Sequence, residues 1–142
     1  IRELIEFEPK SHKTDIAQTL KFLSSTQKKK AIVFVISDFI SEDYEHTLKI
    51  ASKKHDITGI RVYDIREEKM PNLGMVSMLD AETGETHLIN TGSKSVRINY
   101  EKYYQEKLKY FKETFSKSGA GVVNTRVDES YVTKLLGYFK SR

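Results

Sequence analysis

The sequence AIVFVISD, at residues 31–38, decides the fold. Its first six residues, Ala31–Ile36, form the longest unbroken apolar run in the chain and are rich in β-branched side chains. Because successive residues of a strand point to opposite faces, this run predicts a strand that is buried on both sides, as in a parallel sheet covered by helices. Asp38 follows the strand directly, so its side chain would lie at the edge of the sheet where the strand ends.

The residues before this strand predict helical structure. The segment 1–7 has the pattern of the last turns of a helix, which the proline at position 9 would end. A second amphipathic helix is expected to open with Thr14 in or next to its N-cap. Its apolar positions recur at helical spacing, and they are Ile16, Leu20 and Leu23.

The residues after the strand complete a βαβ unit. Ser41 is expected to cap a helix that runs to Lys54, with acidic residues in its first turn and lysines in its last. Residues 57–63 predict a second strand, which ends at Asp64. A strand, a helix and a strand at this spacing indicate parallel pairing with a right-handed crossover.

The second half of the chain predicts a hairpin, a long helix, a strand and a final helix. Two alternating segments around a glycine-containing turn at 81–84 indicate a β-hairpin over about residues 74–90. A long amphipathic helix is expected from about 95 to 117, then a strand at 122–127 and a helix capped by Asp128. We therefore predict an α/β fold with three layers and a short, mostly parallel sheet, in which residues 1–142 form a single domain.

An aromatic stripe marks the inner face of the long helix. Its members follow one another at intervals of three or four residues, and lysines occupy the other side of the helix. This spacing favours packing against the sheet over stacking on nucleic-acid bases. The stripe consists of Tyr100, Tyr104, Leu108, Phe111 and Phe115.

Composition excludes several functional classes. There is no cysteine among the 142 residues, which excludes disulfides, thiolate metal sites and cysteine nucleophiles, and fits a reducing compartment. An apolar run of six residues is far shorter than the roughly 20 that a membrane-spanning helix needs. The net charge of +4 arises from interleaved acids and bases. We therefore expect a cytoplasmic protein that contacts neither nucleic acid nor membrane through this segment.

Asp38 is the strongest candidate for chemistry. Ligands of parallel sheets gather at the carboxyl ends of strands, so its carboxylate could bind a hard divalent cation. It could equally form a turn or cap the following helix, and the residue pattern leaves both roles open. Thr14 alone suggests a helix cap, and Asp64 suggests a turn residue or a second acid at the same edge. The four scattered histidines do not have the paired spacing of a zinc site.

Four segments resemble the bacterial domain-of-unknown-function family number fifty-eight, in order along essentially the whole chain. They lie at 7–15, 33–39, 61–64 and 80–85, and the most specific are the Ile-Ser-Asp-Phe strand end and the Asp-x-Glu-Thr-Gly-Glu hairpin. Members of that family are similar to von Willebrand factor A domains and are commonly encoded beside MoxR-type AAA+ ATPases.

The resemblance implies a Rossmann-like sheet with a metal-ion-dependent adhesion site at its carboxyl edge. In that site Mg²⁺ is held by an Asp-x-Ser-x-Ser loop, a threonine and an aspartate, and here Thr14 and Asp38 match the last two. The first motif does not occur in this sequence. We therefore expect the chain to be a C-terminal fragment of a longer parent protein. Mg²⁺ would bind in that parent and only weakly, if at all, to this incomplete site.

The function implied is a non-enzymatic protein-interaction module that works with a MoxR-type AAA+ ATPase in protein assembly or maturation. The alternative is a Mg²⁺-dependent phosphohydrolase or nuclease that uses Asp38 and Asp64. The missing first strand would also leave the edge of strand 31–36 open, which proteins rarely tolerate. We therefore expect a homodimer, strand exchange or a rearranged terminal segment to cover that edge.

Overall fold

A three-stranded parallel sheet organises the structure, a computed structural model that describes residues 2, 6, 14–80 and 83–141. The strands are β1 (Ile32–Ser37), β2 (Asp56–Tyr63) and β5 (Gly121–Arg126), in the order β1-β2-β5. A separate antiparallel pair joins β3 (Met75–Leu79) to β4 (Thr86–Asn90). These findings confirm the predicted mixed α/β fold with a mostly parallel sheet and the predicted hairpin. Most of the helical segment expected before residue 9 lies outside the described residues.

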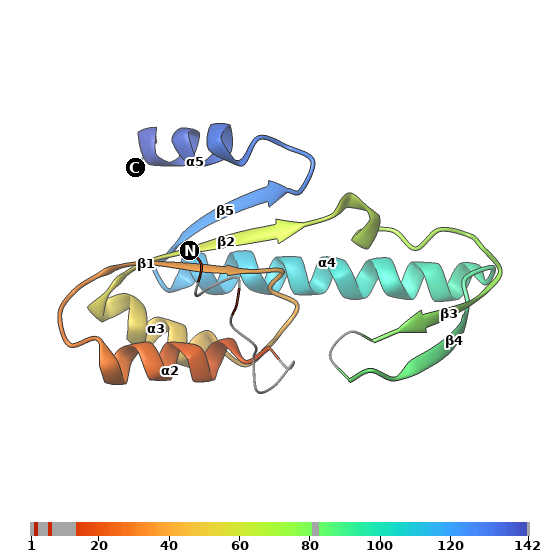
Figure 1. Ribbon diagram of the computed structural model, residues 1–142, viewed down its shortest axis with the longest axis horizontal. Helices are drawn as coiled ribbons and strands as arrows, with labels where there is room; N and C mark the ends of the chain where they lie inside the picture. The colour runs from red at the N-terminus through yellow and green to blue at the C-terminus, as the bar shows by residue number, and fades with distance from the viewer. Residues whose placement is uncertain (1, 3–5, 7–13, 81–82, 142) are drawn as a thin grey trace.

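Helices cover the two faces of the sheet unequally (Figure 1). Among the described residues, three helices pack on one face, and a single short helix lies on the other. The first three are α2 (Ile16–Thr26), α3 (Glu45–Lys54) and α4 (Lys94–Lys117), and the last is α5 (Tyr131–Lys140). A short 3-10 helix, η1 (Ile65–Glu67), follows β2. In the part of the chain that the structure describes, no helix is both long enough and apolar enough to cross a membrane.

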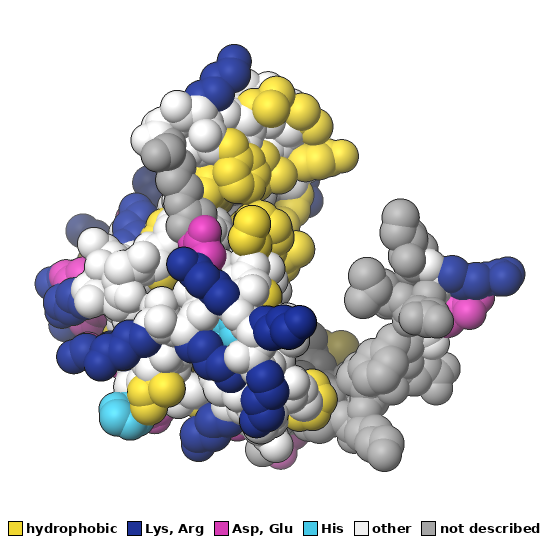
Figure 2. Space-filling view, turned by 90° about the vertical axis from the view of Figure 1, so that its left-hand side faces the viewer, with side chains coloured by type: hydrophobic (Ala, Val, Ile, Leu, Met, Phe, Trp, Pro, Cys, Tyr) yellow, Lys and Arg dark blue, Asp and Glu magenta, His cyan; other side chains and the backbone are white. Residues whose placement is uncertain are grey.

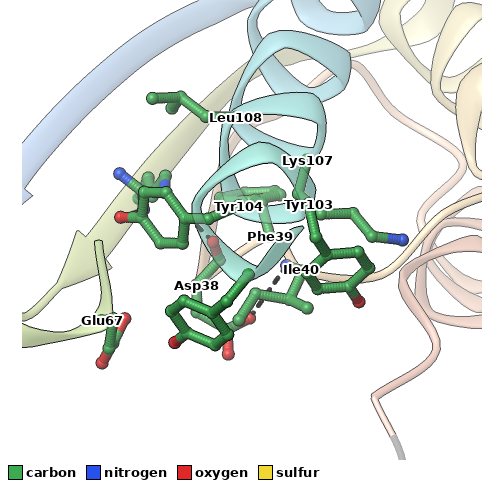
Figure 3. A pocket seen from close by; sticks show the side chains of 10 residues that line it. Asp38, Phe39, Ile40, Glu67, Tyr103, Tyr104, Lys107 and Leu108 are labelled. Carbon is green, nitrogen blue, oxygen red and sulfur yellow. Dashed lines mark hydrogen bonds between the residues drawn. The ribbon is translucent and has the colours of Figure 1, made fainter. Parts of the chain in front are cut away.

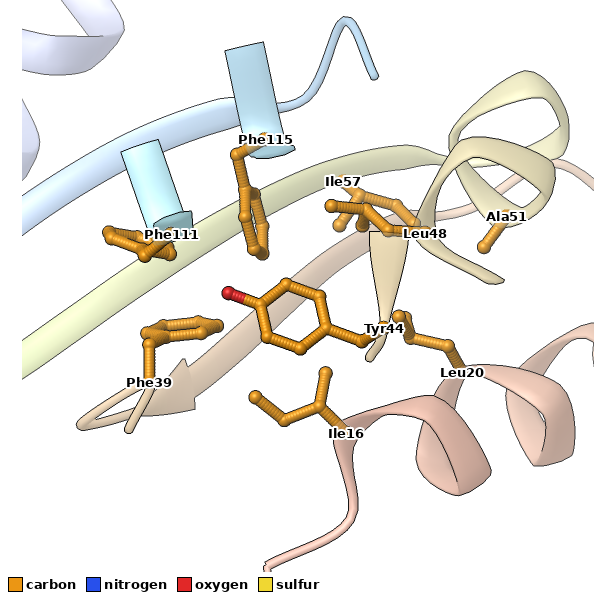
Figure 4. Close-up of a cluster of buried hydrophobic side chains, with 9 residues drawn as sticks. All are labelled: Ile16, Leu20, Phe39, Tyr44, Leu48, Ala51, Ile57, Phe111 and Phe115. Carbon is orange, nitrogen blue, oxygen red and sulfur yellow. The ribbon is translucent and has the colours of Figure 1, made fainter. Parts of the chain in front are cut away.

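The hydrophobic core lies between the sheet and the three-helix face (Figure 4). At its centre Phe39 stacks on Phe111 with ring centroids 4.1 Å apart and meets Phe115 edge-on at 5.2 Å. Tyr44 closes the cluster from the loop before α3, and burial raises the pKa of its hydroxyl. Aromatic pairs of this kind add about 0.5–1.5 kcal/mol each beyond the burial of their area. The remaining members of the buried cluster are Ile16, Leu20, Leu48, Ala51 and Ile57.

The prediction that the first strand is buried on both faces was wrong. Ile32, Phe34 and Ile36, all on the α5 side, have 68%, 45% and 67% of their surface exposed. The reason is that β1 is an edge strand and α5 covers it only in part. The covering contact is between Phe139 and Phe34, whose ring centroids lie 6.0 Å apart. The strand therefore carries apolar side chains on both faces, but only one of these faces is buried.

Two helix caps also differ from the predictions. Helix α3 begins at Glu45 and not after Ser41, because Asp43 adopts a left-handed backbone with φ of 62°, which interrupts helical geometry. Asp128 does not cap the final helix. Its carboxylate pairs with Arg126 at 2.7 Å, and the side chain of Ser130 accepts the capping hydrogen bond. By contrast, Thr14 stands next to the true N-cap, as predicted, because Asp15 accepts the hydrogen bond from the Gln18 amide at 2.7 Å.

Gly59 in the central strand allows α4 to approach the sheet closely. A Cβ atom at this position would lie 2.5 Å from one ring carbon of Phe115 and 2.9 Å from one of Phe111. Both rings are fully buried, so neither has free space into which it could move.

We predict that Gly59→Ala destabilises the fold by about 1–3 kcal/mol through overpacking, measured by urea unfolding. The matched control is Gly137→Ala in α5, where an added Cβ meets nothing within 4 Å. That variant should be neutral or gain about 0.5–1 kcal/mol, because alanine is the better helix former. Equal stabilities for the two variants would contradict the proposed packing.

Candidate functional site

Asp38 lies at the carboxyl end of β1, in a turn that hydrogen bonds between neighbouring residues stabilise. Its Oδ1 accepts hydrogen bonds from the Ile40 amide and the Ser37 hydroxyl, both at 3.2 Å. The Ser37 hydroxyl in turn accepts from the Phe39 amide at 3.1 Å. Among the described residues, Oδ2 accepts no hydrogen bond, and the side chain is exposed. The turn therefore presents one carboxylate oxygen at the edge of the sheet.

Thr14 and Asp38 line the same hollow, with a volume of about 530 Å³. Thr14 comes from the turn before α2, and Asp38 from the end of β1. Asp80, which follows β3, lines the same hollow because the hairpin folds back toward this edge (Figure 1). The described residues that line it are Thr14, Asp38, Ile40, Ser41, Asp80 and Tyr103. Two residues that the family resemblance assigned to one site thus line one space, and a second carboxylate joins them.

The donors in this hollow suit magnesium in kind but not in number. Carboxylate and hydroxyl oxygens are the hard ligands that Mg²⁺ prefers, and the ion requires near-octahedral coordination. Within residues 14–80 and 83–141, no group of three or more His, Cys, Asp or Glu side chains is arranged to hold a metal ion. Asp38, Thr14 and Asp80 would therefore supply part of a coordination shell, and further donors would have to complete it.

Asp64 has a local structural role. Its carboxylate accepts a hydrogen bond from the Arg66 amide at 2.9 Å and caps η1. This is the turn function that its position after β2 suggested.

A smaller cavity of about 130 Å³ lies beside the hollow (Figure 3). Tyr103 and Tyr104 project from α4 over the turn that carries Asp38. The two spaces are adjacent, because Asp38, Ile40 and Tyr103 line both. The other residues of the smaller cavity are Phe39, Arg61, Glu67, Tyr100, Tyr104, Lys107 and Leu108. We call this cavity the tyrosine pocket.

Arg61 forms the inner wall of the tyrosine pocket and is 4% exposed. Its Nε donates to the Asp38 carbonyl at 3.2 Å, and its Nη2 donates to the Tyr104 hydroxyl. The guanidinium carbon lies 4.2 Å from the centre of the Tyr63 ring. No carboxylate of the described chain lies within salt-bridge distance of it. Sequence reasoning did not identify Arg61 as a site residue, although a charge within the central strand was an available signal.

The remaining charges of the tyrosine pocket are arranged differently. Lys107 pairs with Glu42 at 2.5 Å. Burial lowers its pKa, but the hydrogen bond to Glu42 and the contact with Tyr103 outweigh this, so the pKa is raised overall. Glu67 has a buried oxygen, Oε2, without a hydrogen-bond partner in the described structure. Burial raises the pKa of Tyr100, and the charge of Glu67 raises it further.

The comparisons with known proteins assign the family. A family model described as "Protein of unknown function DUF58" matches residues 1–110, more than half of the chain. The chain belongs to the DUF58 family. This confirms the resemblance drawn from the four sequence segments at the level of the family.

Two relatives of this chain are described as uncharacterized proteins. An uncharacterized protein of Mycobacterium avium is 25% identical over 129 residues, which cover 90% of this chain and 76% of that protein. An uncharacterized protein of Mycobacterium tuberculosis is 22% identical over 135 residues, which cover 94% of this chain and 42% of that protein. The DUF58 chain thus spans less than half the length of the second relative. No solved structure matches it significantly.

The Arg61–Tyr104 contact predicts a stability difference between a buried and an exposed tyrosine. Tyr104→Phe removes the hydroxyl that accepts from a buried guanidinium, and we expect a loss of about 1.5–3 kcal/mol in the free energy of unfolding. Tyr131→Phe is the control, since 64% of Tyr131 is exposed and its change should stay within about 0.5 kcal/mol. Chemical denaturation measures both, and a Tyr104 variant as stable as its control would refute the contact.

Proposed function

We propose that this DUF58 chain is part of a protein-interaction module, von Willebrand factor A-like in fold, whose binding face is the hollow around Asp38. The observation that carries the proposal is the convergence of Thr14 and Asp38, far apart in the sequence, on one space. The oxygens of Thr14, Asp38 and Asp80 would hold part of a Mg²⁺ coordination shell there, and in a longer protein further donors would complete it. The bound ion would then accept a carboxylate from a partner protein.

The partner we propose is a MoxR-type AAA+ ATPase, with a role in the assembly or maturation of other proteins in the cytoplasm. Support for this part comes from the sequence resemblance described above. A binding role also fits the Asp38 turn, because its carboxylate is held in place by hydrogen bonds and is exposed, so a partner protein could reach it. No reaction is needed to account for its geometry.

Metal binding tests the proposal directly. Titration of the chain with Mn²⁺ as a paramagnetic stand-in for Mg²⁺ should broaden NMR signals around Asp38 and Asp80, with weak affinity because the shell is incomplete. Asp38→Asn should abolish the broadening, because it replaces the charged ligand by a neutral amide. Asp64→Asn is the control and should bind as the wild type does, because that carboxylate caps η1.

Two results would contradict the proposal. Broadening that Asp38→Asn leaves unchanged would mean that the ion binds elsewhere. Mg²⁺-dependent phosphatase or nuclease activity of the longer protein, lost in both aspartate variants, would favour the enzymatic alternative. Capture of the ATPase by the longer protein in the presence of Mg²⁺, and not by its Asp38→Asn form, would support the proposed partnership.

We also propose that the open edge of β1 pairs with a second copy of the chain. The strand Ile32–Ser37 has no charged residue and no proline, the features with which proteins protect a sheet edge. Pairing two copies across a two-fold axis is self-complementary and would continue the sheet. The exposed apolar face of β1 also continues onto α5, where hydrophobic side chains gather at the upper part of the molecule in Figure 2.

Ile36→Lys should shift the chain from dimer to monomer in sedimentation velocity at micromolar concentration, because a charge on an edge strand opposes pairing. Ile50→Lys is the control on the exposed side of α3 and should remain dimeric. Both variants should keep the wild-type circular dichroism spectrum. A monomeric wild-type chain would rule out this interface.

A further inference from the structure

Lysines from two segments of the chain lie together at the amino end of the parallel sheet, and we call them the lysine cluster. One group precedes β1, and the other ends α3. The members are Lys28, Lys29, Lys30, Lys53 and Lys54. The two groups are neighbours because β1 and β2 begin side by side, with Ile32 opposite Asp56. The fold therefore concentrates positive charges that lie far apart in the sequence.

Lys54 fixes the loop that carries the other group of lysines. Its Nζ donates hydrogen bonds to the carbonyl oxygens of Ser24 and Gln27, at 3.0 and 2.6 Å. These two bonds join the end of α3 to the end of α2 and to the start of the loop. The loop lysines are thus held beside the end of α3, and the cluster is a defined surface of the molecule.

The described residues do not neutralise the positive charge of the lysine cluster. All its members except Lys54 are fully exposed. No carboxylate of the described chain lies within salt-bridge distance of any member, whereas Lys102 and Lys117 on α4 both pair with glutamates. Figure 2 shows this end of the molecule, where basic side chains outnumber acidic ones. A surface of one sign attracts opposite charge, so the cluster favours an anionic partner.

Exposed apolar side chains border the lysine cluster. Phe22 on α2 has 67% of its surface exposed, and Ile50 on α3 has 52%. Each lies in the last turns of its helix, and α2 and α3 pack side by side (Figure 1). Ile50 is about one helical turn before Lys53 and Lys54, so one face of α3 combines apolar and basic side chains.

This combination fits an anionic membrane surface better than a nucleic acid. Lysine ammonium groups attract anionic headgroups without a fixed geometry, and apolar side chains beside them enter the boundary between headgroups and acyl chains. A nucleic-acid duplex would offer no apolar environment to Phe22 and Ile50. The two segments also contain no arginine, the residue that recognises phosphates and bases through paired hydrogen bonds.

We propose that the lysine cluster, together with Phe22 and Ile50, binds the anionic surface of a membrane peripherally. The sequence pattern predicted no membrane contact, because net charge and the length of apolar runs do not reveal which side chains the fold brings together. The cluster lies at the amino end of β1, and the Asp38 hollow lies at its carboxyl end. A chain bound in this way would keep the hollow turned away from the membrane.

Cosedimentation with vesicles tests the proposal on the intact chain. Binding is compared between vesicles of phosphatidylcholine alone and vesicles that also contain phosphatidylglycerol, in buffer without divalent cations. We expect binding to the anionic vesicles and none to the neutral ones. Binding should weaken as salt is added, because salt screens exposed charges.

A triple variant tests the contribution of the lysines. Replacing Lys28, Lys29 and Lys30 by glutamine should weaken binding to anionic vesicles by about a hundredfold, because each lysine near such a surface contributes about fivefold. The matched control removes the same charge from exposed lysines at the opposite end of the molecule, and it should lose less than about threefold. Its substitutions are Lys69→Gln, Lys94→Gln and Lys102→Gln.

A second pair of variants tests the apolar contact. Phe22→Ser should weaken binding to anionic vesicles by about tenfold, because the ring then no longer leaves water for the membrane boundary. Leu88→Ser is the control, since Leu88 is 71% exposed on β4 and lies away from the lysine cluster. It should bind as the wild type does. Circular dichroism checks that every variant is folded.

Several outcomes would overturn the proposal. Absence of binding, or equal binding to neutral and anionic vesicles, would remove the role of the lysines. Equal losses in the two triple variants would show an effect of net charge alone, and unchanged binding by Phe22→Ser would contradict the apolar contact. Binding of duplex DNA without binding of vesicles would make the cluster a nucleic-acid interface. Because the assay contains no Mg²⁺ and no ATPase, failure of the proposed function would leave its result unaffected.

Discussion

Burial of Phe39 is the interaction on which the functional edge of this molecule depends. The residue adopts a left-handed backbone with φ of 58°, which costs a non-glycine residue about 1–3 kcal/mol. The ring gains about 1.5–3 kcal/mol from burial, and its contacts with Phe111 and Phe115 add about 0.5–1.5 kcal/mol each. Packing therefore outweighs strain. With Phe39 turned inward, the preceding residue, Asp38, remains at the surface, and its carboxylate faces the hollow.

The same turn is held from the sheet by Arg61. Its Nε binds the Asp38 carbonyl, and its Nη2 binds Tyr104 on α4, so one side chain links the central strand, the turn and the long helix. A buried charge without a carboxylate partner is costly unless its donors are used, and here hydrogen bonds and tyrosine rings replace an ion pair. Fixing the backbone in this way leaves the carboxylate of Asp38 available, which a salt bridge between Asp38 and Arg61 would not.

Local patterns predicted the elements, while tertiary packing determined where they are covered. The βαβ unit, the hairpin and the long helix followed from periodicity, and the inner face of α4 at Phe111 and Phe115 followed from helical spacing. The cap at Ser41 could not be excluded from sequence, because the left-handed residue at Asp43 arises where the buried Tyr44 enters the core. Nor does an apolar run reveal whether its strand is central or at an edge, so the exposure of Ile36 was not foreseen.

The candidate site divides in the same way. That Thr14 and Asp38 share one hollow was expected from the resemblance to a known family, and the structure places both there. Asp80 required the three-dimensional path of the hairpin, since nothing in its spacing connects it to β1. Arg61 was missed because the alternation of side chains along a strand predicts the face of the sheet on which a residue lies. It does not predict which helix packs against that residue.

The uneven covering of the sheet separates the two proposed contacts in space. The side packed by α2, α3 and α4 holds the buried cluster and so carries most of the hydrophobic stabilisation. The hollow and the tyrosine pocket lie at the carboxyl end of β1, whereas the outer edge of β1, which pairs with no other described strand, runs along its length. Pairing along that edge would use main-chain groups of Ile32–Ser37, and binding at the hollow would use side chains beyond Ser37. The two contacts draw on different atoms of the same strand, so one need not displace the other, and the strand itself provides the rigid connection between them.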